Sequence, residues 1–227
     1  MSPTRGEFDT LAVFCDFDGT FSVQDVGSTL AKRHLGALRA KLWAEYEAGG
    51  QTAWQYTRRL FEGFSLPEAE LQRFLETIEL DAGAHALVAW CTERGVPFRI
   101  LSDGFDYNLD RLQDIHGVCF AHTSNHLRYV QGRWQIEAGQ PDPECGCGTG
   151  TCKQSVIASW RAGHPGAYCV HIGNGRVSDT CGAIAANLAF AKETLAEELE
   201  GRGVAFERYD DLNDVVAELE ARYSSLG

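Results

Sequence analysis

Short apolar runs that end in glycine-containing polar turns alternate along this chain with stretches of helical periodicity. The runs LAVFCDF (11–17), VPFRILSDG (96–104) and AYCVHIGNG (167–175) have the length and boundaries of buried strands. Helix-like patterns fill residues 105–117, 153–164, 178–191, 193–203 and 212–223. This alternation predicts an α/β fold, a Rossmann-like core in which helices cover both faces of a parallel sheet.

One long helical segment interrupts the alternation after the first strand. Apolar residues recur at helical spacing from Leu30 to Tyr46, and two further helices are predicted near residues 54–64 and 67–78. A connection between a strand and the next helix usually has about 2–6 residues, so this segment is too long to be one. We therefore predict a small helical cap domain, residues 24–81, inserted into a core domain formed by residues 1–23 and 82–227. The aromatic side chains of the cap are expected to form its interior.

A second irregular segment precedes the helix at Lys153. HLRYVQGRWQIE (126–137) has the pattern of a β-hairpin that turns at Gln131–Gly132. PDPECGCGTGTCK (141–153) is rich in proline, glycine and cysteine, which predicts a loop that leads into the helix.

Polar side chains gather where the predicted strands end. Asp16 and Asp18 follow the first strand, and Ser102 ends the second. Asn174 ends the third, and Asp179 follows a glycine-containing turn. Because ligands bind at the carboxyl ends of the strands in such sheets, these residues are expected to surround one site.

The residue types at these strand ends fit phosphoryl transfer. Asp16 and Asp18 are two residues apart, so at an extended strand end they face the same side. Such a carboxylate pair is tolerable beside Mg²⁺, which prefers one or two carboxylates together with water and phosphate oxygens. Lys153, Ser102 and Thr20 would hold an anion. Acids, a divalent cation and an anion clamp together indicate a phosphoryl-transfer site.

Charge and hydropathy narrow the possible partners. The net charge of −12 argues against binding to nucleic acid or to an anionic membrane surface. No apolar stretch approaches the ~20 residues of a membrane span, and MSPTRGEFDT lacks the apolar centre of a signal peptide. We expect a cytoplasmic protein whose partner is a small phosphorylated metabolite. Its eight cysteines are then thiols or metal ligands rather than a disulfide framework.

Four motifs in order resemble those of the haloacid dehalogenase superfamily phosphatases. DFDGT (16–20) matches D-x-D-x-T, Ser102 in ILSDG closes a strand, Lys153 opens a helix, and GNGRVSD (173–179) matches the Gly-Asp turn followed by an acid. The resemblance covers nearly the full length. The position of the cap is similar to that in the phosphoserine phosphatase branch.

The resemblance implies a role for each matching residue. Asp16 would be the nucleophile that forms an aspartyl-phosphate, and Asp18 the general acid and then the base. Mg²⁺ would be bound by the Asp16 side chain, the Asp18 backbone carbonyl and a group from Asn174 or Asp179.

Further residues of these motifs are expected to contact the substrate. Thr20, Ser102 and Lys153 would orient the phosphoryl oxygens, and Asp103 and Gly104 belong to the same phosphate-binding segment. Asp25 matches a substrate-facing acid and is expected at the mouth of the cap.

One position departs from the family pattern. The first acid of the fourth motif, usually a metal ligand, is Asn174 here. An asparagine can bind Mg²⁺ through its carbonyl oxygen but supplies no charge. We therefore expect Asp179 to contribute more to the metal site than usual; the alternative is a weakened Mg²⁺ site.

The cysteine-rich loop offers a second metal. Cys145, Cys147 and Cys152 are suitable ligands for Zn²⁺, with a histidine to complete the set. The candidates for that fourth ligand are His122, His126 and His164. The other cysteines lie in apolar runs and are expected to be buried as small hydrophobic residues: Cys15, Cys91, Cys119, Cys169 and Cys181.

The predicted function is a Mg²⁺-dependent phosphatase of small metabolites. DFDGT with Asp25, the cysteine loop and AFAKETL (189–195) resemble the group that acts on 2-hydroxy-3-keto-5-methylthiopentenyl-1-phosphate in methionine salvage. Phosphoserine is the second substrate candidate, with a cap arginine for its carboxylate from among Arg33, Arg39, Arg58 and Arg59. Phosphoethanolamine or phosphocholine is the third. A catalytically weakened binding protein is the alternative from another class.

Overall fold

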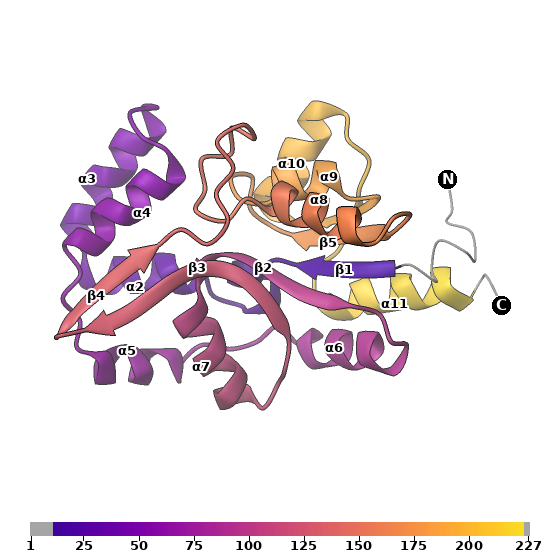
Figure 1. Ribbon diagram of the computed structural model, residues 1–227, viewed down its shortest axis with the longest axis horizontal. Helices are drawn as coiled ribbons and strands as arrows, with labels where there is room; N and C mark the ends of the chain where they lie inside the picture. The colour runs from indigo at the N-terminus through magenta and orange to yellow at the C-terminus, as the bar shows by residue number, and fades with distance from the viewer. Residues whose placement is uncertain (1–10, 225–227) are drawn as a thin grey trace.

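The computed structural model describes residues 11–224, and its centre is a seven-stranded sheet (Figure 1). The strand order is β4-β3-β2-β1-β5-β6-β7. All neighbouring strands are parallel except the antiparallel pair of β3 and β4. The strands are β1 (Leu11–Cys15), β2 (Phe98–Phe105), β3 (Ala121–Val130), β4 (Arg133–Glu137), β5 (Tyr168–Gly173), β6 (Leu188–Ala191) and β7 (Glu207–Arg208). The predicted α/β fold with a parallel sheet is confirmed.

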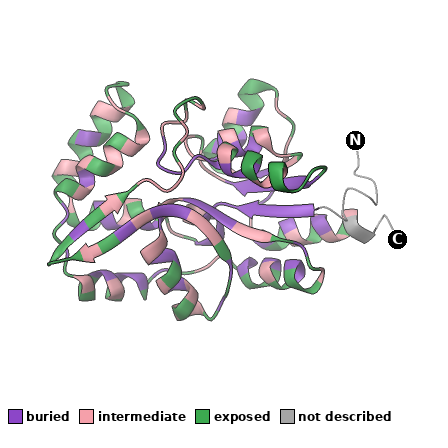
Figure 2. Ribbon diagram, in the orientation of Figure 1, coloured by how far each residue is buried: buried purple, intermediate pink, exposed green. Residues whose placement is uncertain are grey.

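Helices cover both faces of the sheet, as Figure 1 shows. On one side lie α6 (Ala84–Glu93), α7 (Asp106–His116) and α11 (Leu212–Ser224); on the other lie α8 (Lys153–Gly163), α9 (Thr180–Ala185) and α10 (Glu193–Arg202). The central strand β1 is buried on both faces because its side chains alternate between two apolar clusters. Val13 packs in the cluster that includes α6 and α11, whereas Phe14 packs with Ile157 of α8. Figure 2 shows this continuous buried layer.

Four helices lie between β1 and β2 in the chain: α2 (Val26–His34), α3 (Gly36–Glu47), α4 (Ala53–Glu62) and α5 (Glu68–Leu75). We call them the cap helices. Their starts are stabilised locally: Asp25 accepts the Ser28 N–H at the start of α2, and Thr52 and Gln55 form a capping box on α4. The helical content predicted for this segment is present in the structure, and the domain boundaries remain a prediction.

The cap helices have only a small apolar cluster of their own. Ala31, Leu42 and Leu60 form it, whereas the buried side chains of α5 join the main core. The Phe61 ring packs against Phe105 of β2, with ring centroids 4.7 Å apart. The expectation that the cap aromatics form the interior of the cap is therefore wrong for Phe61, Phe64 and Phe74, which pack with the main core.

The segment 178–191 is not one helix, as its pattern had suggested. Helix α9 ends at Ala185, and residues 188–191 form β6, which pairs with β5 from Val170↔Leu188 onward. Four apolar residues are compatible with a buried strand and with a helix. Backbone pairing with the edge of β5 stabilises the strand. The predicted hairpin is confirmed: Val130 pairs with Arg133, and Gln131 and Gly132 have φ values of 50° and 79°.

The register of the central strands brings the predicted strand-end residues together. Cys15 is level with Ile100 of β2 and with Ile172 of β5. Asp16 and Asn174 directly follow β1 and β5 at this edge, whereas Ser102, predicted to end the second strand, lies inside β2, which continues to Phe105. Strands β2 and β5 are the neighbours of β1 on its two sides, so the strand order changes direction at β1. In α/β proteins, the carboxyl edge at such a point is the usual place for a ligand. Within residues 11–224, every helix is too short or too polar to span a membrane.

Candidate active site

A buried lysine between two carboxylates lies at the centre of the site. The Lys153 side chain is in the first turn of α8 and is fully buried. Its Nζ donates to Oδ1 of Asp16, which follows β1, and to Oδ1 of Asp179, which precedes α9. Three segments far apart in the sequence therefore meet at one ammonium group.

The charges of this cluster depend on one another. Burial raises the pKa of Asp16 to about 7, and the Asp179 charge adds to this while Lys153 opposes it. Burial also raises the pKa of Asp179, but the charge of Lys153 and the hydrogen bond from His171 outweigh it and lower that pKa overall. For Lys153, burial lowers the pKa, but the two carboxylates outweigh burial and raise that pKa overall, so the ammonium stays charged.

The Asp179 carboxylate has no free acceptor position. Its Oδ1 accepts from Lys153 and lies 3.1 Å from Nε2 of His171, and its Oδ2 accepts the N–H groups of Asn174 (3.2 Å) and Gly175 (2.9 Å). A carboxylate has about four acceptor sites, so these four contacts use them all. Asp179 thus orients Lys153 and the turn that carries Asn174, and direct metal binding by Asp179 remains a prediction that requires one donor to leave.

Asp18 and Ser102 form a second pair at the same edge of the sheet. Oδ1 of Asp18 accepts the Val26 N–H at 2.7 Å, and Oδ2 accepts the Ser102 hydroxyl at 3.4 Å. Burial, followed by the charges of Asp25 and Asp16, raises the pKa of Asp18. A protonated carboxyl group is what a general acid requires.

A glycine keeps the space beside this pair open. A Cβ at Gly104 would lie 2.9 Å from the Ser102 hydroxyl oxygen and 3.0 Å from Oδ2 of Asp18. The Gly104 N–H also donates to the Ser102 oxygen at 2.9 Å. Such a space suits a phosphoryl oxygen, although the phosphate role of Gly104 itself remains a prediction.

Thr20 and Asn174 meet beside the first motif. The buried Thr20 hydroxyl donates to Oδ1 of Asn174 at 3.2 Å. Gly19 has φ 78°, and a Cβ there would lie 2.4 Å from Nδ2 of Asn174, so only glycine allows this approach. Nδ2 of Asn174 donates to Oε2 of Glu193 at 3.0 Å. Glu193 supplies the nearby negative charge that Asn174 itself lacks.

The Asp103 carboxylate faces the loop before α8. Its Oδ1 accepts the N–H groups of Gly150 (2.8 Å) and Thr151 (3.1 Å) and the Asn125 amide at 3.0 Å. The structure therefore shows Asp103 fixing the approach to Lys153. Its predicted contact with the substrate is not tested by these bonds.

Asp25 lies where α2 begins and close to a cap arginine. Burial raises its pKa, against the opposing effects of the Ser28 N–H, Lys32 and Arg39. Arg39 contacts Ser28 Oγ at 3.4 Å and lies over the Trp43 ring, and its buried Nε has no hydrogen-bond partner. Arg59 is paired with Glu45 and Arg33 lies over Phe74, whereas the charge of Arg39 acts on Asp25.

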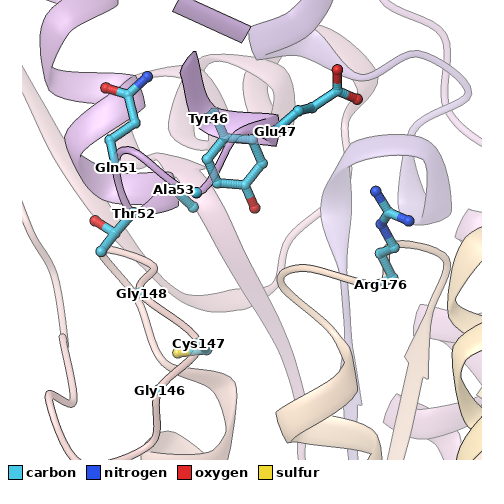
Figure 3. A pocket seen from close by; sticks show the side chains of 10 residues that line it. Tyr46, Glu47, Gln51, Thr52, Ala53, Gly146, Cys147, Gly148 and Arg176 are labelled. Atoms are coloured by element: carbon cyan, nitrogen blue, oxygen red, sulfur yellow. The ribbon is translucent and has the colours of Figure 1, made fainter. Parts of the chain in front are cut away.

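A cavity of about 580 Å³ lies between the cap helices and the core (Figure 3). Tyr46, Thr52 and Ala53 line it from the cap, and Cys147 and Arg176 from the core. Arg176 is two residues beyond Asn174, and the loop that carries Cys147 ends at Lys153. The lining does not include Asp16, Asp18 or Lys153, so the cavity lies beside the catalytic cluster and not on it.

The residues at the site are suitable ligands for Mg²⁺. The Asp16 carboxylate and the Asn174 carbonyl are hard oxygen donors from adjacent strand ends, which is the donor type this ion prefers. The structure also identifies site residues that sequence reasoning did not assign. His171 lies within β5 and Arg176 in the turn that follows it, whereas Glu193 reaches the site from another segment, the start of α10.

The cysteines differ from the sequence prediction in two places. Cys181 is not a buried hydrophobic residue: its sulfur joins those of Cys145, Cys147 and Cys152, all within 4.8 Å of one another. Cys119 is exposed, whereas Cys15, Cys91 and Cys169 are buried as predicted. None of the three candidate histidines completes the set, because His122 contacts Asp110, His126 contacts Asp106, and His164 contacts the Trp160 carbonyl.

The comparisons with known proteins identify the family of this chain. A family model of haloacid dehalogenase-like hydrolases matches residues 13–183, so the chain belongs to that family. The predicted enzyme class, a phosphoric monoester hydrolase of this family, is confirmed.

Individual relatives span most of this chain. The 2-hydroxy-3-keto-5-methylthiopentenyl-1-phosphate phosphatase of Bacillus pumilus is 26% identical over 214 residues, which are 92% of this chain and 90% of that protein. The protein of the same name from Geobacillus thermodenitrificans is 27% identical over 221 residues, or 92% and 97%. A substrate-bound phosphoserine phosphatase has the same fold, with a TM-score of 0.67, 19% identity, and coverage of 92% and 97%.

We predict that Asn174→Asp tightens Mg²⁺ binding roughly fivefold, about 1 kcal/mol, because it adds a carboxylate beside the ion. Glu193 adds to the binding, since its carboxylate lies 3.0 Å from Nδ2 of Asn174 and contributes negative charge near the ion. The double change Asn174→Asp with Glu193→Gln should therefore bind Mg²⁺ less tightly than Asn174→Asp alone. Titration calorimetry checks both variants, and unchanged or weaker affinity in Asn174→Asp contradicts the assignment of Asn174 to the metal.

We also predict that Lys153→Met lowers the free energy of unfolding by about 3–5 kcal/mol, because it leaves two buried carboxylates without their cation. Urea denaturation measures the effect. Lys41→Met, on the exposed side of α3, is the matched control and should be neutral within about 0.5 kcal/mol. Equal stability of the two variants would mean that Lys153 does not compensate the buried charges.

Proposed function

We propose that this protein is a Mg²⁺-dependent phosphatase of a small phosphorylated metabolite, with 2-hydroxy-3-keto-5-methylthiopentenyl-1-phosphate as the leading substrate. One observation carries the proposal: at the carboxyl edge of the sheet Asp16 pairs with the buried Lys153, and the half-buried Asp18 accepts from the buried Ser102 hydroxyl. Relatives with that substrate in their name align over about nine tenths of the chain, which supports the choice.

In the first half-reaction, an oxygen of Asp16 attacks the phosphorus atom and the bond from phosphorus to the substrate oxygen breaks. Asp18 donates its proton to that leaving oxygen, which its raised pKa permits. The product is the dephosphorylated metabolite and an aspartyl-phosphate on Asp16. Lys153 stabilises the negative charge that remains on the phosphoryl group.

In the second half-reaction, water attacks the phosphorus atom of the aspartyl-phosphate. Asp18, now a carboxylate, takes a proton from that water, and the bond between phosphorus and the Asp16 oxygen breaks. Inorganic phosphate leaves, and both acids return to their starting forms. The hydrogen bonds from Ser102 and Val26 hold Asp18 in place for both steps.

Mg²⁺ would be held by Asp16, Asn174 and the Asp18 backbone carbonyl. When bound, it supplies positive charge that stabilises the phosphoryl oxygens and favours the ionised form of Asp16. Thr20 orients the Asn174 carbonyl for this role through its hydroxyl.

The surroundings of the cavity fit the leading substrate. Its name describes a methylthio group, a ketone and a hydroxyl group, and no carboxylate. Tyr46 on the cavity wall packs with Trp43 and Tyr56, with ring centroids 5.5–6.0 Å apart. A thioether gains about 0.3–1.5 kcal/mol against aromatic rings. Arg176, Gln51 and Thr52 offer donors for the ketone and hydroxyl oxygens.

A specific observation favours phosphoserine as the second candidate. Arg39 has a buried Nε without a partner, and it lies close to the Asp25 carboxylate. The Arg39 guanidinium suits the carboxylate of an amino acid, and the Asp25 carboxylate suits its ammonium group. The shared fold with phosphoserine phosphatases does not decide the matter, because one fold supports several substrates.

Asp16→Asn should reduce phosphate release from p-nitrophenyl phosphate with Mg²⁺ by more than about a thousandfold, because the amide cannot form the aspartyl-phosphate. The variant should stay folded, since Asp179 still pairs with Lys153. Asp114→Asn, an exposed site on α7, is the control and should keep full activity. If the unchanged protein releases no phosphate with any divalent cation, it is a binding protein and not a phosphatase.

Measurement of kcat/KM for a panel of phosphorylated metabolites tests which substrate is preferred. We expect the highest kcat/KM for the methylthiopentenyl phosphate, at least about tenfold above phosphoserine, phosphoethanolamine and phosphocholine, which corresponds to about 1.4 kcal/mol of transition-state binding. Arg39→Met should then change kcat/KM for the best substrate by less than threefold. If phosphoserine is instead the best substrate and Arg39→Met raises its KM more than tenfold, the second candidate replaces the first.

A further inference from the structure

Four cysteine sulfurs come together outside the catalytic cluster. Cys145 and Cys147 lie in the loop of residues 138–152, which we call the cysteine loop, and Cys152 is its last residue. Cys181 is in the first turn of α9. Their four Sγ atoms lie within 4.8 Å of one another, although Cys181 is 29 positions beyond Cys152 in the chain. Two separate segments therefore contribute to one sulfur cluster.

This arrangement has the dimensions of a tetrahedral metal site. A Zn–S distance of about 2.3 Å places the four sulfurs of such a site about 3.8 Å apart. A contraction of about 1 Å at most brings the widest pair of the cluster to this separation. Gly146 follows Cys145 with φ 75°, and this turn directs the two sulfurs of the C-x-C pair to the same point.

The chemistry of the cluster selects a different ion from the catalytic site. Thiolates are soft ligands that favour Zn²⁺, whereas the oxygen donors of Asp16 and Asn174 favour Mg²⁺. Four thiolates leave no open position, which is the form of a structural zinc site. The Thr149 hydroxyl lies 3.2 Å from the Cys147 sulfur and donates to the Thr151 carbonyl at 3.0 Å, so a Cys147 thiolate would compete with that carbonyl for its proton.

A pair of disulfides explains the cluster less well. All four cysteines are free thiols in the structure. A disulfide brings two sulfurs to about 2.05 Å and does not require a second pair of cysteines nearby. Here all four sulfurs are mutual neighbours. A single ion that contacts every sulfur accounts for the whole arrangement.

We propose that Cys145, Cys147, Cys152 and Cys181 bind one Zn²⁺ ion that fixes the cysteine loop to α9. The site joins two parts of the catalytic cluster, because Cys152 precedes Lys153 and Cys181 is two residues beyond Asp179. Lys153 and Asp179 form the buried ion pair described above. The zinc ion thus positions both side chains without touching the substrate.

The same ion would also fix one wall of the cavity. Cys147 and Gly148 line the cavity opposite Thr52 of the cap (Figure 3). The Gly148 carbonyl accepts the Trp54 N–H of α4 at 2.8 Å. A cysteine loop without its metal would therefore loosen the contact between the cap helices and the core.

Metal analysis of the full chain tests the site directly. Protein purified under reducing conditions from zinc-supplemented culture should contain about one Zn²⁺ per chain by mass spectrometry of its metals. Replacement of that ion by Co²⁺ should give intense sulfur-to-cobalt charge-transfer absorption in the near ultraviolet and the strong visible bands of a tetrahedral site. Neither measurement depends on catalysis.

Variants assign the ion to the four cysteines. Cys181→Ser and Cys147→Ser should each lose most of the zinc and lower Tm by roughly 5 °C or more. Cys119→Ser, an exposed cysteine outside the cluster, is the matched control and should keep both zinc and Tm. If a cluster variant fails to fold, the cobalt spectrum of the unchanged protein still decides the question.

Three results would overturn the proposal: no zinc after reconstitution of the reduced protein, a disulfide between two of these cysteines, or iron in place of zinc. The proposal stands apart from the proposed catalytic function. Asp16→Asn protein should keep its zinc while it loses activity. An active phosphatase without zinc refutes only this site, and a zinc-containing protein without phosphatase activity refutes only the proposed function.

Discussion

The structure of the site depends on one buried ammonium group between two carboxylates. Removing a charged group from water is expensive, and several kcal/mol per ion remain even after the protein relaxes. Lys153 is tolerated because Asp16 and Asp179 both accept from it, and Asp179 is held in turn by His171 and by two backbone N–H groups. The cluster still has one more negative than positive charge when both acids are ionised. A divalent cation and a phosphate dianion can therefore enter together without a large net change in charge.

This interaction constrains the fold because its three members come from three segments. Asp16 is placed by β1, and its backbone N–H is bonded to Ile172 of β5. Lys153 is placed by the start of α8, which Asp103 fixes through the N–H groups of Gly150 and Thr151. Backbone contacts of β5 and of the loop before α8 thus determine where the Asp16 carboxylate and the Lys153 ammonium meet. The four cysteines lie around the same junction, where a metal ion would hold α8 and α9 together.

The elements that sequence predicted best are those with a strong local signal. The runs that became β1 and β5 end just before Asp16 and Asn174, β2 carries Ser102 and continues to Phe105, and parallel strands bring these residues to one edge. The segment 178–191 was misjudged because its four strand residues are also compatible with a helix, and only pairing with β5 decides. Cys181 and Glu193 were missed for a related reason. Their roles arise from contacts between distant segments, which no local pattern encodes.

The negative charges close to position 174 explain why an asparagine is favourable there. A fourth carboxylate close to Asp16, Asp18 and Asp179 would raise the repulsion that Lys153 alone must offset. Asn174 instead accepts from Thr20 through its carbonyl and donates to Glu193 through its amide group. Hydrogen bonds in series polarise one another, so the Glu193 carboxylate would make the amide oxygen a better ligand for the proposed Mg²⁺ without adding a full charge next to the ion. The negative charge lies instead on Glu193, an exposed residue, where water screens it. A neutral ligand supported in this way keeps the site able to bind a cation while its buried acids remain compatible with the fold.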